Sequence, residues 1–176
     1  QLSGVATGLI DLDNLLGGLH PSDLLILAGR PSMGKTALAT NIAFHAARSY
    51  RAEPGTSSKL EVVHGAVVGF FSLEMSAEQL AGRILAEASG IRSDHIRRGK
   101  MSNDEFMQLV KASRELSSAP MFIDDTPALS VAALRTRARR LKRTHGLSLL
   151  VIDYLQLMRP NRRHDNRVQE ISEITQ

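Results

Sequence analysis

Short apolar runs alternate with longer amphipathic stretches along most of this chain. The apolar runs are rich in Leu, Val, Ile and Phe and have the length of buried strands; they lie at 24–28, 67–71, 121–123 and 149–152. The amphipathic stretches predict helices at about 36–50, 76–89, 102–117 and 130–145. Strands that alternate with helices in this way predict an α/β fold, in which a mainly parallel sheet has helices on both faces.

Turn and cap residues support the boundaries of these elements. Ser76, Ser102 and Ser130 are the expected N-caps of three helices, and Gly90 and Gly146 are the expected stops of two of them. Residues 51–66 contain Pro54, Gly55, Ser57 and Ser58, which predicts a surface loop or a short hairpin. The apolar spacing of Val168, Ile171 and Ile174 predicts a helix that is cut off partway.

Composition limits the possible classes of protein. The 176 residues are 43% hydrophobic, so we expect one domain with its own core over 1–176. The chain has no cysteine, which excludes disulfides and thiolate metal sites. It has neither a run long enough to span a membrane nor the layout of a signal peptide, so we expect no membrane partner and a cytoplasmic location. The net charge of +4 is compatible with a polyanionic partner.

Residues 29–36 have the G-x-x-x-x-G-K-T pattern of a phosphate-binding loop, here between a predicted strand and a predicted helix. In this setting backbone N–H groups and the helix dipole form an anion site, so we expect ATP with Mg²⁺. Lys35 is expected to reach the β- and γ-phosphates, and the Thr36 hydroxyl to ligate Mg²⁺. The full set of expected nucleotide-binding residues is Gly29, Arg30, Pro31, Ser32, Met33, Gly34, Lys35, Thr36 and Ala37.

Acidic residues follow two of the predicted strands. Asp153 ends the run 149–152, where ligands of open α/β sheets collect, and is a candidate to hold Mg²⁺ in its outer shell. In isolation an Asp that opens a loop would be the better interpretation, but beside the phosphate-binding loop the metal role is favoured. Glu74 is a candidate general base for the attacking water, or alternatively a cap of the following helix. Gln156 could sense a γ-phosphate or a water, which its spacing alone does not decide. Asp124 and Asp125 favour a turn before Pro127.

Two groups of basic residues lie outside the phosphate-binding loop. One crowds the predicted helix 130–145 opposite an apolar face, which favours a solvated surface over a DNA track; its members are Arg135, Arg137, Arg139, Arg140, Lys142 and Arg143. The other lies in a predicted loop and could meet DNA or a neighbouring subunit; its members are Arg159, Arg162, Arg163 and Arg167.

Together these residues resemble the motor domain of the DnaB-type replicative DNA helicases, within the RecA-like ATPases. The resemblance covers nearly the whole chain and rests on blocks at 7–19, 30–36, 72–76 and 152–158. It implies that Lys35 and Thr36 bind phosphate and Mg²⁺, and that Asp153 supports the metal. It further implies that Glu74 activates water and that Gln156 couples the nucleotide state to DNA contacts.

The resemblance also implies a function and partners. We expect an ATP hydrolase and helicase that moves on single-stranded or forked DNA as a homohexameric ring, with a primase and a helicase loader as partners. A RecA-like recombination or repair ATPase is the alternative within the same fold. A nucleotide-binding scaffold with little turnover is the alternative for these 176 residues alone.

The family's motor domain continues past Gln176 with further strands, DNA-gripping loops and an arginine finger. One of those strands lies between the P-loop strand and the strand that ends in Asp153. We therefore expect an incomplete RecA-like sheet here. Its gap either closes, is filled by a neighbouring chain, or leaves the core loosened.

Overall fold

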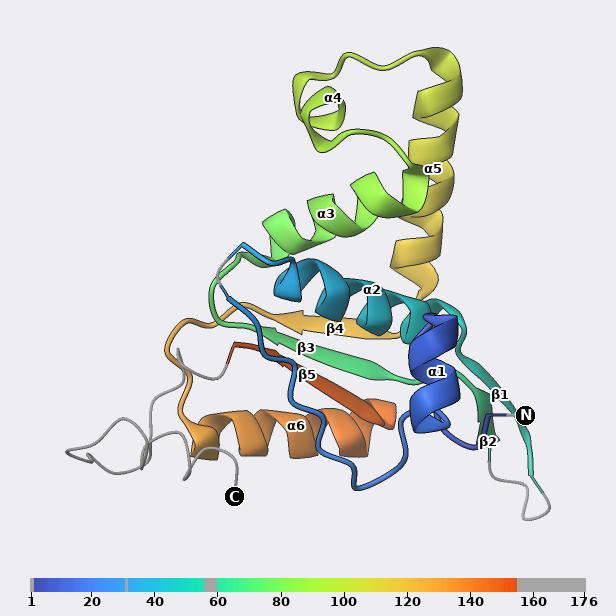
Figure 1. The fold of residues 1–176 in the computed structure, drawn as a ribbon, viewed down its shortest axis with the longest axis vertical. Helices are drawn as coiled ribbons and strands as arrows, with labels where there is room; N and C mark the ends of the chain where they lie inside the picture. The colour runs from blue at the N-terminus through green and yellow to red at the C-terminus, as the bar shows by residue number, and fades with distance from the viewer. Residues whose placement is uncertain (1, 31, 56–59, 155–176) are drawn as a thin grey trace.

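The computed structural model describes residues 2–30, 32–55 and 60–154. The helices are α1 (Ile10–Leu16), α2 (Lys35–Arg48), α3 (Ala77–Ser89), α4 (Ser93–Arg98), α5 (Asn103–Ser118) and α6 (Val131–His145). The strands are β1 (Arg51–Pro54), β2 (Leu60–His64), β3 (Val68–Ser72), β4 (Met121–Asp124) and β5 (Leu149–Asp153) (Figure 1). No helix in these described ranges is long and apolar enough to cross a bilayer.

The central sheet is parallel, with the strand order β4-β3-β5. In its register Phe71 of β3 lies beside Asp124 of β4, and Ser72 of β3 lies beside Asp153 of β5. The carboxyl ends of all three strands therefore meet at one edge, which is where the strand-end acids were expected. Strands β1 and β2 form a separate antiparallel hairpin within the segment 51–66.

The two faces of β3 are covered by different helices (Figure 1). Val68 and Phe70 pack in a cluster with the alanines of α2 and with Leu80 of α3. Phe71, one residue further along, packs in a second cluster with residues of α6 such as Leu134. Because successive side chains of a strand point to opposite faces, every residue of β3 is buried. The predicted α/β arrangement, with helices on both faces of a parallel sheet, is confirmed.

Helix boundaries follow the predicted caps. The hydroxyls of Ser76, Ser102 and Ser130 accept hydrogen bonds from the backbone N–H three residues further on, and Gly90 and Gly146 end α3 and α6 in the left-handed region. In α3 and α5 the third residue also bonds back to the cap, which completes a capping box. The sequence therefore positions α3, α5 and α6 to within a residue or two.

One predicted strand is wrong. Residues 24–28 form no strand, and their leucines and isoleucine are 45–69% exposed. An apolar run becomes a strand only where a neighbouring strand satisfies its backbone N–H and C=O groups. In the described part of the chain the sheet ends at β5, so 24–28 has no neighbouring strand with which to pair.

Helices α1 and α4 were not predicted, and the helix expected near 168–174 lies outside the described residues. Both missed helices are short. α1 is held by hydrogen bonds to the residues just before it. The buried carboxyl of Asp13 accepts them from the N–H and hydroxyl of Thr7 and from the N–H of Gly8. Burial by itself would raise the pKa of Asp13, but these hydrogen bonds outweigh it and hold the pKa below its usual value.

Candidate nucleotide site

The turn before α2 contains the predicted phosphate-binding sequence. Ser32 and Gly34 both have left-handed backbone conformations, with φ of 63° and 84°, and the N–H of Met33 donates to the carbonyl of Arg30 at 3.3 Å. A Cβ on Gly34 would meet nothing within 4 Å, so glycine is required there by the backbone angle rather than by space. Pro31 lies outside the described residues. The turn leads into α2, which has no acidic residue in its first turn.

Thr36 and Asp153 meet across the sheet edge although 117 positions separate them in the sequence. The hydroxyl of Thr36 donates a hydrogen bond to Oδ2 of Asp153 at 2.8 Å, and Asp153 is only 5% exposed. Thr36 lies in the first turn of α2 and Asp153 is the last residue of β5, so packing of α2 across the sheet fixes the contact. Because the hydroxyl has a single hydrogen, both lone pairs of Oγ1 are directed away from Asp153.

Lys35 turns toward the same strand end. Its ammonium lies 5.5 Å from the centroid of the Tyr154 ring, within the range of a cation–π contact. Sequence reasoning gave Tyr154 no role, and a tyrosine after a strand-end acid offers no signal that would reveal one. Lys35, Thr36 and Asp153 are thus brought to one place by α2 and β5.

Glu74 follows β3 at the same edge and is exposed. The buried residue Ser72 shapes the turn before it, because the Ser72 hydroxyl donates to the carbonyl of Met75 at 2.7 Å and accepts from the N–H of Met75 at 3.3 Å. The cap of α3 is Ser76 rather than Glu74. The carboxyl of Glu74 therefore stands at the carboxyl edge without serving as the cap of the helix. Gln156 lies outside the described residues.

The acids after β4 have structural partners. Asp124 pairs with Arg137 of α6 at 2.5 Å and accepts from the N–H of Thr126, and Asp125 accepts from the N–H of Ala77 at the start of α3. Burial would raise the pKa of Asp124, but the bonds from Arg137 and Thr126 outweigh it and lower the pKa. These contacts fit the predicted turn.

Asp153 and Thr36 offer the oxygen donors that Mg²⁺ prefers, and Lys35 with the N-terminus of α2 offers positive charge for phosphates. The residues present therefore fit ATP with Mg²⁺. A Cβ on Gly29 would make only ordinary contacts with the side chains of Lys35 and Met33, so space alone does not require glycine there.

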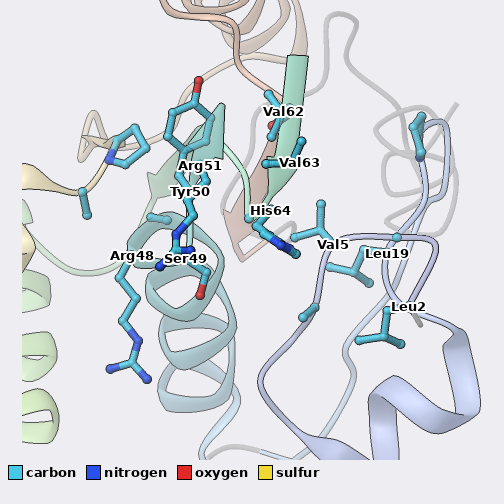
Figure 2. Close-up of a pocket in the computed structure, with 18 of the residues that line it drawn as sticks. Leu2, Val5, Leu19, Arg48, Ser49, Tyr50, Arg51, Val62, Val63 and His64 are labelled. Atoms are coloured by element: carbon cyan, nitrogen blue, oxygen red, sulfur yellow. The ribbon is translucent and has the colours of Figure 1, made fainter. Parts of the chain in front are cut away.

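A broad groove of about 1200 Å³ lies at the opposite end of the sheet (Figure 2). It is lined by the residues that precede the strands, including Tyr50, Pro120 and Ser148, and by the hairpin residues Val62 and Val63. It contains neither the glycine-rich turn nor the strand-end acids. The groove is therefore separate from the edge where Thr36 meets Asp153.

A parallel sheet with helices on both faces, with a glycine-rich turn leading into one helix and an acid at a strand end, places the chain in the class of RecA-like α/β folds. The chain belongs to the DnaB-like helicase C-terminal domain family, whose model matches residues 4–176.

Relatives and a solved structure agree. The replicative DNA helicase DnaB of Rickettsia prowazekii is 54% identical over 173 residues, which are 98% of this chain and 35% of that protein. The DnaB of Geobacillus stearothermophilus is 41% identical over 99% of this chain and 36% of that protein. A DnaB-like replicative helicase, solved in a study of its interactions with primase, matches 99% of this chain and 39% of its own length with a TM-score of 0.84 and 29% identity. The chain thus spans about a third of the length of these relatives.

Proposed function

We propose that this chain is the ATP-binding part of a replicative DNA helicase motor, which couples ATP hydrolysis to movement on single-stranded DNA and to unwinding of the duplex. The observation that carries the proposal is the 2.8 Å contact between Thr36 and Asp153. It joins the phosphate-binding turn to a strand-end acid, and membership of the DnaB-like family supports the assignment.

In this proposal the phosphates of ATP lie over the turn formed by Gly29, Arg30, Pro31, Ser32, Met33 and Gly34, with Ala37 in the first turn of the helix that follows. Lys35 leaves its resting contact with Tyr154 and pairs with the β- and γ-phosphates. Thr36 and Asp153 hold Mg²⁺, which when bound neutralises charge on the β- and γ-phosphates. Thr36 would hold the ion through Oγ1 while its hydroxyl hydrogen stays in the hydrogen bond to Asp153.

Glu74 accepts a proton from the water that attacks the γ-phosphate. Its place after β3, beside the end of β5, and its exposure both suit a group that must reach a water over the phosphates. Most of the acceleration in phosphoryl transfer comes from positioning and charge stabilisation. Glu74, Lys35 and Thr36 supply part of the catalytic set, and an arginine of a neighbouring subunit in the proposed ring completes it. Gln156 relays the nucleotide state to bound DNA.

The partners of the full-length protein are also part of the proposal. We propose single-stranded or forked DNA as the substrate of movement and a homohexameric ring as the working assembly. A primase is proposed because one solved relative is a DnaB-like helicase whose interactions with primase were determined. A helicase loader completes the set that the family membership suggests.

Unwinding of a forked duplex by the full-length protein tests this function. We expect strand separation that requires ATP and Mg²⁺ and that is lost in Lys35→Ala, because the variant lacks the cation that pairs with the phosphates. Strand exchange without unwinding would instead support a RecA-like recombination ATPase.

A further inference from the structure

Helix α6 is strongly basic. Its fifteen residues contain Arg135, Arg137, Arg139, Arg140, Lys142 and Arg143 and no acidic residue. The chain has 22 basic and 18 acidic residues, so the net charge of +4 would become −2 without these six. The positive charge is therefore concentrated on α6 and is not spread evenly over the chain.

Five of the six basic side chains lie on the free face of α6. Leu134 is buried and Leu141 is half-buried against the second core cluster, which fixes the face that meets the sheet. At about 100° per residue the other basic residues fall on the opposite half of the helix. They are all exposed, and they are Arg135, Arg139, Arg140, Lys142 and Arg143.

These five residues have no ion pair within the described part of the chain. Only Arg137, which lies toward the sheet and is half-exposed, has a partner, Asp124. Like charges three and four positions apart on a helix repel one another, so Arg135, Arg139 and Arg143 destabilise α6 by their mutual repulsion. An opposite charge brought by a ligand would relieve this cost.

The sequence pattern by itself favours a solvated surface, but from the unpaired charges on one face we infer that the exposed face of α6 binds the phosphate backbone of nucleic acid, as a contact surface separate from the nucleotide site. Arginine, which supplies four of the five charges, is suited to phosphates because its guanidinium forms paired hydrogen bonds with their oxygens. The face has no exposed large apolar side chain that could insert into a lipid surface or anchor a peptide. The backbone of nucleic acid is therefore the polyanion that fits best.

This surface does not compete with ATP. α6 covers one face of the sheet, whereas α2 and its phosphate-binding turn lie on the other (Figure 1). The inference rests on the proposed function and deepens it, because it gives a motor on DNA a second place of contact, on a helix that leads directly into β5 and Asp153.

The test is the salt dependence of DNA binding by the full-length protein with a non-hydrolysable ATP analogue. The variant replaces Arg135, Arg139 and Arg143 by glutamine, which preserves helix propensity. The matched control replaces the exposed residues Arg97, Arg98 and Lys100 by glutamine, which removes the same charge elsewhere. Fluorescence anisotropy of a labelled single strand and of a duplex, each over a range of salt, gives the slope of log K against log salt.

Loss of three phosphate contacts should reduce the steepness of that slope by about 2 for a single strand and by slightly more for a duplex. A fall in affinity on the order of tenfold at low salt should accompany it, while the control keeps the wild-type slope. A lysine version of the same triple variant should restore the slope, since charge is retained. ATP hydrolysis without DNA should be unchanged, which shows that the fold is intact.

Equal slopes for the α6 variant and the control would overturn the inference while leaving the proposed helicase function in place. Loss of ring assembly with an unchanged slope would assign the face to a neighbouring subunit and would also overturn it. Absence of nucleic-acid binding by the wild-type protein would overturn both.

Discussion

Replacing Thr36 by valine tests the contact on which the nucleotide site depends. Valine keeps the shape of the side chain and removes the hydroxyl that donates to Asp153 at 2.8 Å. In the proposed site that hydroxyl has two tasks, because its hydrogen is held by Asp153 and its oxygen ligates Mg²⁺. We therefore expect Mg²⁺-dependent ATP binding to fall, while binding in the presence of a chelator stays the same.

The size of the effect follows from the kind of hydrogen bond. A bond to a charged group contributes about 1.5–3 kcal/mol, against about 0.5–1.5 kcal/mol for a neutral pair. Loss of the Thr36 hydroxyl should therefore weaken Mg²⁺-dependent binding by roughly ten- to a hundredfold. Asp153→Asn keeps an acceptor for Thr36 but removes the charge of a proposed Mg²⁺-binding residue. It should therefore cost more than the about 1 kcal/mol, or roughly fivefold, that the weaker hydrogen bond alone accounts for.

Calorimetric titration of ATP with and without Mg²⁺ measures both quantities. Thr40→Val is the matched control, since Thr40 lies one turn further along α2 and donates to the carbonyl of Thr36 instead of to Asp153. The double variant of Thr36 and Asp153 should be far less impaired than the sum of the single variants, because the two residues act through one contact. Additive losses, or an equal loss in the Thr40 variant, would refute the shared role.

Three further substitutions test the fold that positions the site. Asp13→Asn should lower the free energy of unfolding by about 1–3 kcal/mol near neutral pH, with Asp11→Asn on the same helix as a near-neutral control. Because the pKa of Asp13 is lowered in the folded protein, its stabilisation is complete above the unfolded pKa of about 4 and is lost as the pH falls through the folded pKa. An equal difference in unfolding free energy between wild type and Asp13→Asn at pH 7 and at low pH would contradict this. Gly34→Ala should destabilise the protein by about 1–2 kcal/mol and weaken ATP binding, because the φ of Gly34 is +84°. Gly82→Ala inside α3 should instead stabilise the protein slightly. Similar melting temperatures for the two variants would argue against backbone strain at Gly34. Phe70→Ala should cost about 3–5 kcal/mol by denaturant titration, while Phe106→Ala on the exposed surface of α5 should cost little, and the reverse order would mean that the core is elsewhere.

Much of the fold is local enough to be predicted from sequence. The runs that became β3, β4 and β5 are apolar on both faces, and serine caps with glycine stops fix α3 and α6. The run 24–28 has the same composition but lacks a partner strand in the described chain, and pairing between distant segments leaves no local trace. The sequence thus predicts which segments can form strands, but each forms one only where a neighbouring strand can pair with it.

The candidate site divides in the same way. The glycine-rich turn and the acid at the end of β5 are both visible in the sequence, but the turn does not follow a strand of the sheet. The direct bond from Thr36 to Asp153 and the contact of Lys35 with Tyr154 depend on how α2 packs across the sheet. Such contacts are fixed by tertiary packing. The sequence could therefore predict the candidate residues of the site, but not which of them are in contact.

Turnover by Glu74→Gln in the full-length protein tests the central claim most directly. Glutamine has nearly the same shape as glutamate but cannot accept a proton from water. The variant should therefore keep ATP binding and lose ATP hydrolysis. We expect ATP·Mg²⁺ affinity within about twofold of wild type and a loss of DNA-stimulated ATP hydrolysis and unwinding on the order of a hundredfold or more. Hydrolysis at the wild-type rate would remove Glu74 as the base and would contradict the assignment of this sheet edge as the site of ATP hydrolysis.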